Sequence, residues 1–371
     1  MYNHNYQQVC AFTALTVRKS LLGKLSAVRQ NPWLIRGDCR KGQIMKKYRI
    51  GMDLGGTNIK TSLFAKDFLA VAEQRTPTMV QLGSDGVLER MENNIRELLS
   101  KAGAVTEEVE CMGMGVPGLL DIENGISLFS PNFPKWENVP IAGWFKERLG
   151  IPVFIDNDVR VNLYGECYFG AGKGKKNVVL LTLGTGLGAG VMIDGHILYG
   201  ATGSMGEIGH MNMYREGRPC RCKSSGCLGR YVSALGLLRT VKEKIEAKEE
   251  TILTDWVGNP DEITAEMVSR AFDAGDLLAR EAMEETGEIL GFGLVNVINL
   301  YNPECVIIGG GMSAAGERLL SKARKIVDTH ALEISRKACT IVTAQLGDAS
   351  GMLGAAKAAS IKMAEQIRDI R

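Results

Sequence analysis

Apolar and polar positions alternate along the chain in blocks that predict strands and helices in turn. Short apolar runs at 48–52, 59–65, 111–116 and 153–155 are typical of buried strands. The segment 86–101 instead repeats its apolar residues at helical spacing and predicts an amphipathic helix. Alternating elements of this kind indicate a fold built from α/β layers.

The order of elements repeats in the second half of the chain. An apolar strand at 178–183, a Gly/Thr-rich turn at 184–188 and an apolar strand at 189–193 echo the strand, turn and strand of 48–65. Such a repeat predicts two similar lobes, each directing one glycine-rich hairpin toward a central cleft. The other predicted elements are a helix at 159–169, a helical stretch at 265–300 interrupted at Gly291 and Gly293, a strand at 305–308, a helix at 317–332, a strand at 340–346 and a helix at 351–367.

The composition is that of a soluble globular protein. Of the 371 residues, 45% are hydrophobic and 23% are charged. No window approaches the about eighteen apolar residues that a membrane span needs. Nine cysteines, an odd number, argue against a disulfide framework and favour a reducing compartment and a metal site. We therefore expect a cytoplasmic protein without membrane segments.

Charge is unevenly distributed along the chain. Residues 1–50 carry ten lysines and arginines against Asp38 alone, which makes this segment +9 and leaves −7 for the remainder. The acidic remainder gives no reason to expect nucleic-acid binding by the main body. An address signal, a mitochondrial-type presequence, a nucleic-acid arm and a solvated tail remain open for the basic segment 1–45. We favour a disordered upstream extension, because Met45 stands directly before the first strand and would be a natural start.

Three glycine-rich turns follow predicted strands, at 53–58, 184–188 and 309–311. Exposed backbone N–H groups in such turns suit phosphate oxygens, and a carboxylate such as Asp53 suits Mg²⁺. None is a Walker A loop, because no Gly-Lys pair is followed by Ser or Thr. The run 113–118 fits a dinucleotide-binding pattern, but a turn follows it instead of the required helix. A single glycine cluster is more often a plain turn, whereas three at strand ends indicate a phosphate site.

The segment Asp156-Asn157-Asp158 lies between a predicted strand and a predicted helix. A carboxylate held at a strand end can take the proton of an attacking hydroxyl while a phosphoryl group is transferred in line. The simpler alternative is that Asp158 caps the helix that begins at Val159. The two roles are compatible, because a base at a helix start is held rigidly. We expect Asp156 to support the site without contacting the substrate.

Four side chains with metal-binding chemistry lie close together in the sequence. His210, Cys220, Cys222 and Cys227 give the spacing H-x9-C-x-C-x4-C, which matches a closed tetrahedral zinc site. The alternative is a set of unrelated free cysteines, but Cys220 and Cys222 stand in a polar segment rather than on an apolar face. Since four protein ligands leave no open position, we expect this zinc to be structural.

Together these motifs resemble the ROK family (repressors, open reading frames, kinases), a branch of the actin/hexokinase-like superfamily. Asp53-Leu-Gly-Gly-Thr57 is similar to its first phosphate motif, Leu183-Gly-Thr-Gly-Leu-Gly188 to its second, and Gly309-Gly-Gly311 to its adenosine-side turn. The resemblance runs from about Tyr48 to about Ala359. It implies a two-lobed, actin-like (RNase H-like) ATPase fold with a cleft between the lobes and a zinc-binding loop in the larger lobe. ATP and Mg²⁺ would bind at Asp53, Gly55, Gly56, Thr57, Gly184, Thr185, Gly186, Gly188, Gly309, Gly310 and Gly311.

The resemblance also implies roles around a sugar substrate. It makes Asp158 the general base of an ATP-dependent sugar kinase and Asn157 the partner that orients a sugar hydroxyl. In the family's Glu-x-Gly-His motif, matched by Glu207 and His210, the Glu binds sugar hydroxyls and the His binds both zinc and sugar. Two further sugar contacts are implied, Gly118 and Asn132.

One position departs from the family pattern. The family usually places Glu after Gly-Cys-Leu, where it grips hydroxyls near the anomeric carbon, and this chain has Gly229 there. Losing that acceptor would weaken sugar binding, or Arg230 or an added substituent would fill the gap. Glucose is therefore the first expectation, and fructose, allose and N-acetylmannosamine remain alternatives. Trp136 is either a pocket wall or a packing residue.

The resemblance predicts a small lobe at 46–160, completed by a C-terminal helix near 352–371, and a large lobe at 161–351. It favours a homodimer or homotetramer, with no nucleic-acid or membrane partner. Because the family includes repressors, a sugar-responsive transcriptional repressor is the alternative function, although the segment before the first strand is short for a winged helix-turn-helix domain. A sugar-binding protein without catalysis is a third alternative, against which Asp53 and Asp158 argue.

Overall fold

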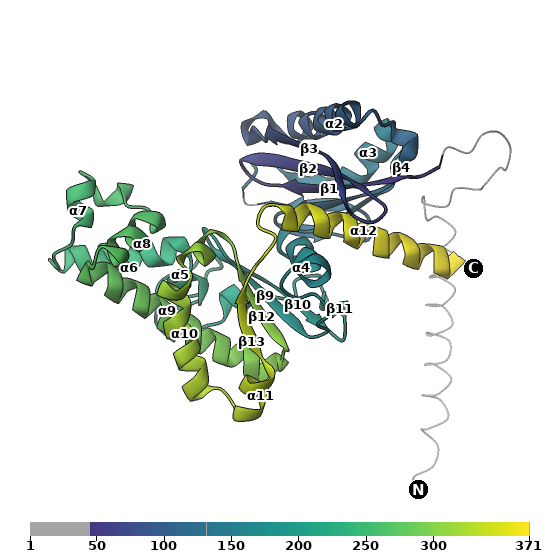
Figure 1. Ribbon diagram of the computed structural model, residues 1–371. Helices are drawn as coiled ribbons and strands as arrows, with labels where there is room; N and C mark the ends of the chain where they lie inside the picture. The colour runs from purple at the N-terminus through teal and green to yellow at the C-terminus, as the bar shows by residue number, and fades with distance from the viewer. Residues whose placement is uncertain (1–44, 131, 371) are drawn as a thin grey trace, which may run out of the picture. The chain divides into compact units, whose positions relative to one another are not determined.

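The computed structural model describes residues 45–130 and 132–370 (Figure 1). The predicted N-terminal extension lies outside the described residues except for Met45. Within the described part, two five-stranded sheets and one three-stranded sheet form the scaffold. No described helix is both long enough and apolar enough to cross a membrane.

The first five-stranded sheet combines antiparallel and parallel pairs. Its strands β3, β2 and β1 are antiparallel neighbours, whereas β1, β4 and β8 run parallel. The parallel strands therefore present their carboxyl ends at one edge, where loops can carry a site. In spatial order the strands are β3 (Ala70–Pro77), β2 (Asn58–Ala65), β1 (Tyr48–Leu54), β4 (Val109–Val116) and β8 (Val153–Asn157).

The second five-stranded sheet repeats this pairing scheme. Strands β11, β10 and β9 are antiparallel neighbours, and β9, β12 and β13 run parallel. The repeat found in the sequence thus corresponds to a duplicated sheet, and the predicted α/β fold class is confirmed. In spatial order the strands are β11 (His196–Ile197), β10 (Leu187–Ile193), β9 (Val178–Leu183), β12 (Cys305–Gly309) and β13 (Thr340–Thr343).

A small antiparallel sheet and the helices complete the described fold. The predicted turn after 113–118 is present, because a strand and a turn follow β4 where a dinucleotide-binding fold would have a helix. The small sheet contains β5 (Leu119–Asp121), β6 (Ile126–Phe129) and β7 (Glu137–Val139). The helices are α2 (Gly83–Ala102), α3 (Ile141–Leu149), α4 (Asp158–Phe169), α5 (Gly229–Val232), α6 (Ala234–Glu246), α7 (Leu253–Trp256), α8 (Ala265–Asp273), α9 (Leu277–Tyr301), α10 (Glu317–His330), α11 (Glu333–Ala338) and α12 (Ala349–Ile370).

The C-terminal helix α12 packs against β1 and β4 of the first sheet and against α4 (Figure 1). Glycines in the strands make this close approach possible. A Cβ at Gly51 would lie 1.8 Å from the carbonyl oxygen of Met352, and one at Gly113 would lie 1.8 Å from that of Ala355. Any side chain at these two glycines would push α12 away from the sheet.

Strand β9 of the second sheet is buried on both faces. Val179 and Leu181 belong to a large core shared with α6 to α10, whereas Val178 and Leu180 pack with Leu163 of α4. Burial on both faces explains why β9 reads as a continuous apolar run without alternation. Helix α4 contacts strands of both five-stranded sheets and therefore links them.

The helical stretch predicted at 265–300 differs in one respect. The break falls at Gly275, which has a φ of 90°, and Asp276 then caps α9 by accepting a hydrogen bond from the Ala279 N–H at 2.7 Å. The predicted interruption at Gly291 and Gly293 was wrong, because α9 continues through both. These glycines serve packing instead: a Cβ at Gly291 would lie 2.6 Å from Ile326 Cβ of α10.

Candidate active site and metal centre

Three parallel strands of the first sheet bring acidic residues to one edge. Asp53 of β1 pairs with Gly115 of β4, and Gly115 pairs with Asp156 of β8. Asp158 follows as the first residue of α4. A Cβ at Gly115 would lie 3.7 Å from Asp53 Oδ1 and 3.5 Å from the Cα of Asp158. Asp53 and Asp158, far apart in the sequence, therefore both lie beside Gly115.

The start of α4 is capped by Asn157. Its Oδ1 accepts a hydrogen bond from the Val159 N–H at 3.0 Å, and Asp158 Oδ1 accepts from the same N–H at 3.0 Å. Capping alone therefore does not account for Asp158, because Asn157 already supplies it. The same contacts hold both side chains in fixed orientations at the helix N-terminus.

Burial raises the pKa of both candidate carboxyl groups. For Asp53, lost hydration and the neighbouring charge of Asp158 raise the pKa to about 6, partly opposed by Lys60. Burial also raises the pKa of Asp158, against the hydrogen bond from the Val159 N–H. Neighbouring carboxylates that repel each other and are poorly hydrated suit cation binding and proton acceptance.

The first glycine-rich turn joins β1 to β2. The Gly55 N–H donates to the Asn58 carbonyl at 3.0 Å, and Thr78 Oγ1 donates to the Gly55 carbonyl at 2.6 Å. Gly56 and Thr57 at the tip are exposed. A Cβ at Gly56 would lie 3.8 Å from the Cβ of Asn132, so the predicted sugar contact Asn132 lies beside this turn.

The second and third turns lie next to each other in the second sheet. Gly309, the last residue of β12, pairs with Thr182 of β9. Gly310 has a φ of 79°, and a Cβ there would lie 2.4 Å from the Leu183 carbonyl oxygen, so only glycine fits. The Gly184 N–H donates to the Gly186 carbonyl at 2.9 Å, and Thr185 is exposed. Among the described residues, no heavy atom beyond the glycine and its chain neighbours lies within 4 Å of a Cβ built at Gly184, Gly186 or Gly311.

The start of α4 connects the first site edge to the second turn. A Cβ at Gly188 would lie 2.6 Å from Val159 Cγ2, directly after Asp158. One at Gly209 would lie 2.3 Å from the Leu187 carbonyl oxygen, next to Gly188. The strand start of β10 therefore contacts both the residue after Asp158 and the residue before His210.

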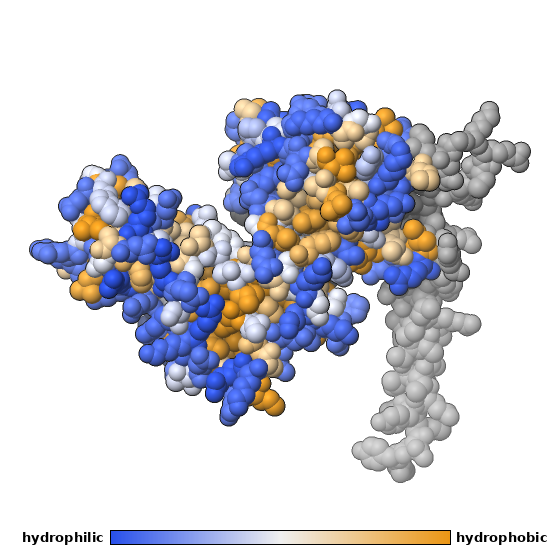
Figure 2. All heavy atoms as spheres, viewed as in Figure 1, coloured by the Kyte–Doolittle hydropathy of each residue, from blue (hydrophilic) through white to orange (hydrophobic). Residues whose placement is uncertain are grey.

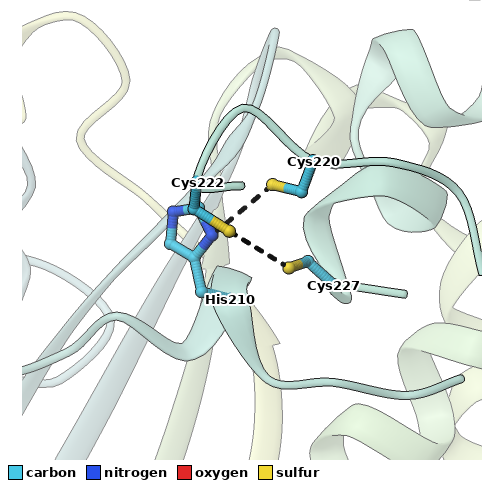
Figure 3. A group of neighbouring side chains, drawn as sticks. All are labelled: His210, Cys220, Cys222 and Cys227. Atoms are coloured by element: carbon cyan, nitrogen blue, oxygen red, sulfur yellow. Dashed lines mark hydrogen bonds between the residues drawn. The ribbon is translucent and has the colours of Figure 1, made fainter. Parts of the chain in front are cut away.

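The four predicted metal ligands lie together (Figure 3). One ligand atom from each of His210, Cys220, Cys222 and Cys227 lies within 4.8 Å of the other three. Cys220 Sγ is 3.7 Å from His210 Nδ1, and Cys222 Sγ is 3.6 Å from Cys227 Sγ. Tetrahedral zinc with Zn–S bonds of about 2.3 Å requires sulfur atoms about 3.8 Å apart. The observed spacings therefore suit a tetrahedral ion.

The ring nitrogens of His210 face different partners. Nδ1 faces the sulfur cluster, whereas Nε2 lies 3.8 Å from Glu207 Oε2. A neutral imidazole that gives Nδ1 to a metal keeps a proton on Nε2, which can then donate toward a carboxylate or a hydroxyl. Both Glu207 and His210 are exposed, so a ligand can reach them.

The thiols of the cluster differ in acidity. The backbone amide of Ser224 and the neighbouring Cys220 lower the pKa of Cys222 to about 7. Burial and the adjacent sulfurs of Cys222 and Cys220 raise the pKa of Cys227 to about 12. A cation among the sulfurs would stabilise the thiolate form of all of them.

The structure explains two other residues considered for the sugar side, Gly118 and Trp136, by local packing. Gly118, between β4 and β5, has a φ of 101°, and a Cβ there would lie 2.1 Å from the Phe129 carbonyl oxygen of β6, so only glycine fits at this position. Trp136 is 1% exposed and donates to Ser127 Oγ at 2.9 Å. Trp136 is therefore a packing residue and does not line a pocket.

Gly229 begins α5 beside the loop that carries His210. A Cβ there would lie 3.3 Å from both the Gly209 carbonyl oxygen and Leu187 Cβ. A side chain at this position would therefore lie between the residue before His210 and Leu187 at the start of β10.

Sequence reasoning missed two glycines that shape the site. Gly115 gives the space between Asp53 and Asp158, and a Cβ at Gly351 of α12 would lie 3.2 Å from Asp53 Oδ2. Gly115 belongs to the run 113–118 that resembled a dinucleotide motif. The sequence signal at Gly115 was present, but its role depends on α4, which brings Asp158 and Val161 beside it, and the role of Gly351 depends on the C-terminal helix.

A duplicated sheet that joins acidic strand ends to glycine-rich turns defines an actin-like ATPase fold. The chain belongs to the ROK family, because the model of that family matches residues 49–361.

Named relatives include both enzymes and regulators. A glucokinase of Thermotoga maritima is 36% identical over 83% of this chain and 95% of its own length. A xylose repressor of Caldicellulosiruptor bescii is 32% identical over 83% of this chain and 76% of its own length. The crystal structure of a ROK family glucokinase from Streptomyces griseus, in complex with glucose and AMPPNP, is 31% identical, with a TM-score of 0.71 over 84% of this chain and 99% of that one.

Proposed function

We propose that this chain is an ATP-dependent hexose kinase that phosphorylates a hydroxyl of glucose. The observation that carries this proposal is the convergence of Asp53 and Asp158 at Gly115, beside glycine-rich turns, in a chain related to glucokinases. A repressor needs to bind sugar without reacting, so it does not require a carboxylate pair of raised pKa.

The residues divide the reaction between them. Asp158 accepts the proton of the sugar hydroxyl while the oxygen of that hydroxyl attacks the γ-phosphorus of ATP. The bond to the leaving ADP breaks, and a sugar phosphate ester forms. Asn157 orients that hydroxyl. Asp53 would hold Mg²⁺, which would supply positive charge beside the phosphates. The backbone N–H groups of the three glycine-rich turns would donate to the nucleotide phosphates and line the adenosine side.

We further propose that His210, Cys220, Cys222 and Cys227 hold one structural zinc. The donor set and the sulfur spacing of 3.6 Å support zinc over harder cations, which prefer oxygen ligands. Zinc at Nδ1 would orient His210 so that Nε2 and Glu207 form one wall of the sugar pocket. Gly118 and Asn132 would contribute to the opposite part of that pocket.

The substrate is proposed to be glucose, on the similarity to glucokinases. Gly229 removes a carboxylate that would bind hydroxyls near the anomeric carbon, so glucose would bind less tightly than it does with the family's usual Glu. Fructose, allose and N-acetylmannosamine are the sugars to compare.

The lobes and the assembly are part of the same proposal. The small lobe would comprise 46–160 and a C-terminal helix near 352–371, and the large lobe 161–351, which agrees with the packing of α12 on the first sheet. Exposed apolar side chains on α9 and beside α11 support self-association as a homodimer or homotetramer, and Figure 2 shows apolar atoms at the surface near α11. They include Phe292, Leu300, Leu332 and Ile334, which are 37%, 72%, 60% and 81% exposed. The free thiols of the described cysteines favour the cytoplasm.

A coupled assay tests the function directly. The purified chain is incubated with Mg·ATP and each of the four sugars, and ADP release is measured beside binding to duplex DNA. We expect ADP release that depends on sugar and is strongest with glucose. Specific DNA binding without sugar-dependent ADP release would instead support the repressor alternative, which the similarity to xylose repressors raises.

A further inference from the structure

A buried charged network lies directly behind the candidate catalytic turn. Asp156 is 2% exposed, and its Oδ1 accepts hydrogen bonds from the Asn157 N–H at 2.7 Å and from Arg160 Nε at 2.6 Å. Its Oδ2 accepts from the Tyr199 hydroxyl at 2.7 Å and lies 3.5 Å from Lys362 Nζ. Every oxygen of this carboxylate is therefore engaged by groups from outside its own strand.

The partners of Asp156 come from three different parts of the fold. Arg160 belongs to α4, and Lys362 belongs to α12. Tyr199 follows β11 of the second sheet. Arg160 Nη1 also donates to the Gly203 carbonyl at 2.8 Å. Two hydrogen bonds thus join the end of β8 and the start of α4 to the loop 199–206.

The loop 199–206 leads directly to Glu207 and His210. It is anchored at its far end as well, because a Cβ at Gly206 would lie 2.5 Å from the Ala189 carbonyl oxygen of β10. The Met205 N–H donates to the Tyr199 carbonyl at 3.0 Å, which closes the loop on itself. A shift of Tyr199 or Gly203 would therefore also move Glu207 and His210.

The charges keep this network intact. Burial disfavours ionised Asp156, but the cations Lys362 and Arg160 and the Tyr199 hydroxyl outweigh it and hold the pKa of Asp156 below its usual range. Burial and the Asp156 charge raise the pKa of Tyr199, so its hydroxyl remains a donor. A buried, fully hydrogen-bonded carboxylate holds its neighbours in one arrangement.

We infer that Asp156, Arg160 and Tyr199 are positioning residues that fix the Asn157-Asp158 turn relative to the loop that carries Glu207 and His210. This inference rests on the proposed kinase function for its kinetic consequence. Asp158 follows β8 of the first sheet, whereas Glu207 and His210 follow β11 of the second sheet. Phosphoryl transfer requires these residues to hold fixed positions around the same sugar. A displacement of a reacting group by about 1 Å can lower the rate by about a hundredfold.

The neighbouring tyrosines provide a matched pair of variants. Tyr199→Phe removes the hydroxyl that bonds Asp156 but keeps the ring, which lies 5.1 Å from the Arg160 guanidinium. Tyr164→Phe removes a buried hydroxyl whose neighbour is the Tyr199 hydroxyl at 3.4 Å, and which does not contact Asp156. The two variants lose the same group at adjacent positions, so they share any general effect on packing.

Kinetics of the full chain separate positioning from structure. We expect Tyr199→Phe to lower kcat/KM for the sugar by about tenfold while the KM for Mg·ATP and the zinc content stay unchanged. Tyr164→Phe should match the wild type in all three. Arg160→Lys, which keeps the charge but loses the bond to Gly203, should reduce kcat/KM similarly. In the double variant Arg160→Lys/Tyr199→Phe, kcat/KM should fall by less than the product of the two single-variant fold-changes, because both residues act through one network.

Hydrogen exchange supplies a readout that does not depend on turnover. Amide exchange at 200–206 and at 157–160 should increase together in Tyr199→Phe and stay at wild-type levels in Tyr164→Phe. A Tyr199→Phe protein with a lowered Tm but wild-type sugar kinetics and unchanged exchange at 157–160 would overturn the inference. If the wild type turned over no sugar, the proposed function would fail, while coupled exchange at the two segments would still decide the positioning role.

Discussion

The two five-stranded sheets share a pairing scheme but differ in the chemistry of their strand ends. Asp53 in β1 pairs with Gly115, and Thr182 occupies the matching place in β9, where it pairs with Gly309. Each is followed by Leu-Gly and a turn. Asp53 is a poorly hydrated carboxyl beside Asp158, whereas Thr182 Oγ1 donates to the Gly188 carbonyl at 3.3 Å. The duplicated scaffold thus provides a charged half for chemistry and a neutral half that shapes a binding turn.

The halves also differ in what they carry between strands. The first has the small sheet β5 to β7 between β4 and β8, whereas the second has the loop 210–227 with the proposed metal ligands and helices α5 to α9 between β11 and β12. A short antiparallel sheet needs no ion to order it. The loop 210–227 has few buried apolar residues, so the proposed zinc, bound by residues at both of its ends, would supply the missing constraint.

The largest effect should come from the base in the charged half. Asp158→Asn should lower kcat by a hundredfold or more, roughly the contribution of a positioned base. Sugar binding and Tm should change little, since Asn157 retains the helix cap. Steady-state kinetics and calorimetric sugar titration measure both, and a kcat within a few-fold of the wild type would remove Asp158 from this role.

The matched positions Asp53 and Thr182 test the comparison itself. Asp53→Ala should lower kcat/KM for Mg·ATP by roughly ten- to a hundredfold, because it removes a charged ligand worth about 1.5–3 kcal/mol. Thr182→Ala should cost less than about fivefold, since it removes one long neutral hydrogen bond. Equal losses in the two variants would contradict the division of labour between the halves.

Metal removal should act on the sugar side. Cys222→Ser should reduce zinc from about one per chain to near zero and raise the sugar KM by about tenfold, with a smaller change in kcat. Cys339→Ser, outside the cluster, should retain zinc and activity. Elemental analysis with sugar-dependent kinetics measures this, and wild-type protein purified without chelator yet free of zinc would refute the metal proposal.

Restoring the family's carboxylate should have an effect of about tenfold. If Gly229 only lacks a contact to glucose, Gly229→Glu should lower the glucose KM by about tenfold, equivalent to about 1.4 kcal/mol. Gly229→Gln controls for size, because the space beside Gly209 and Leu187 is tight. Weaker binding of the best substrate in Gly229→Glu, with glucose still poor, would show that the pocket serves another sugar.

The smallest effect concerns acidity. Mg·ATP binding should weaken as the pH falls through about 6, because Asp53 then gains a proton and loses its charge. Asp158→Asn removes the neighbouring charge that raises this pKa, so the midpoint should move to lower pH. Thr182→Ala should leave it in place. Calorimetric titration across this pH range measures the midpoints, and an identical midpoint in Asp158→Asn would show that the two carboxyl groups do not interact.

Local sequence alone determined the pieces of the candidate site. The quartet from His210 to Cys227 was recognisable because its members lie on one short loop, where spacing decides whether they can meet. The glycine-rich turns and the start of α4 were equally readable, because their conformations depend on neighbouring residues. These features rest on backbone freedom, capping and ligand chemistry, which act over a few residues.

Only the tertiary structure decided how the pieces meet. Asp53 and Asp158 share one space because Gly115 and Gly351 leave it open, and Gly351 arrives on a helix from the C-terminus. The hydrogen bond from Tyr199 to Asp156 joins the two sheets, and the two residues meet because α4 packs against strands of both sheets. Pattern reasoning placed a break at Gly291 and Gly293 because it read glycine as a helix breaker, whereas α9 continues through both, with Gly291 packed against α10 and Gly293 against Leu228. Long-range packing sets these relations, and no local propensity encodes them.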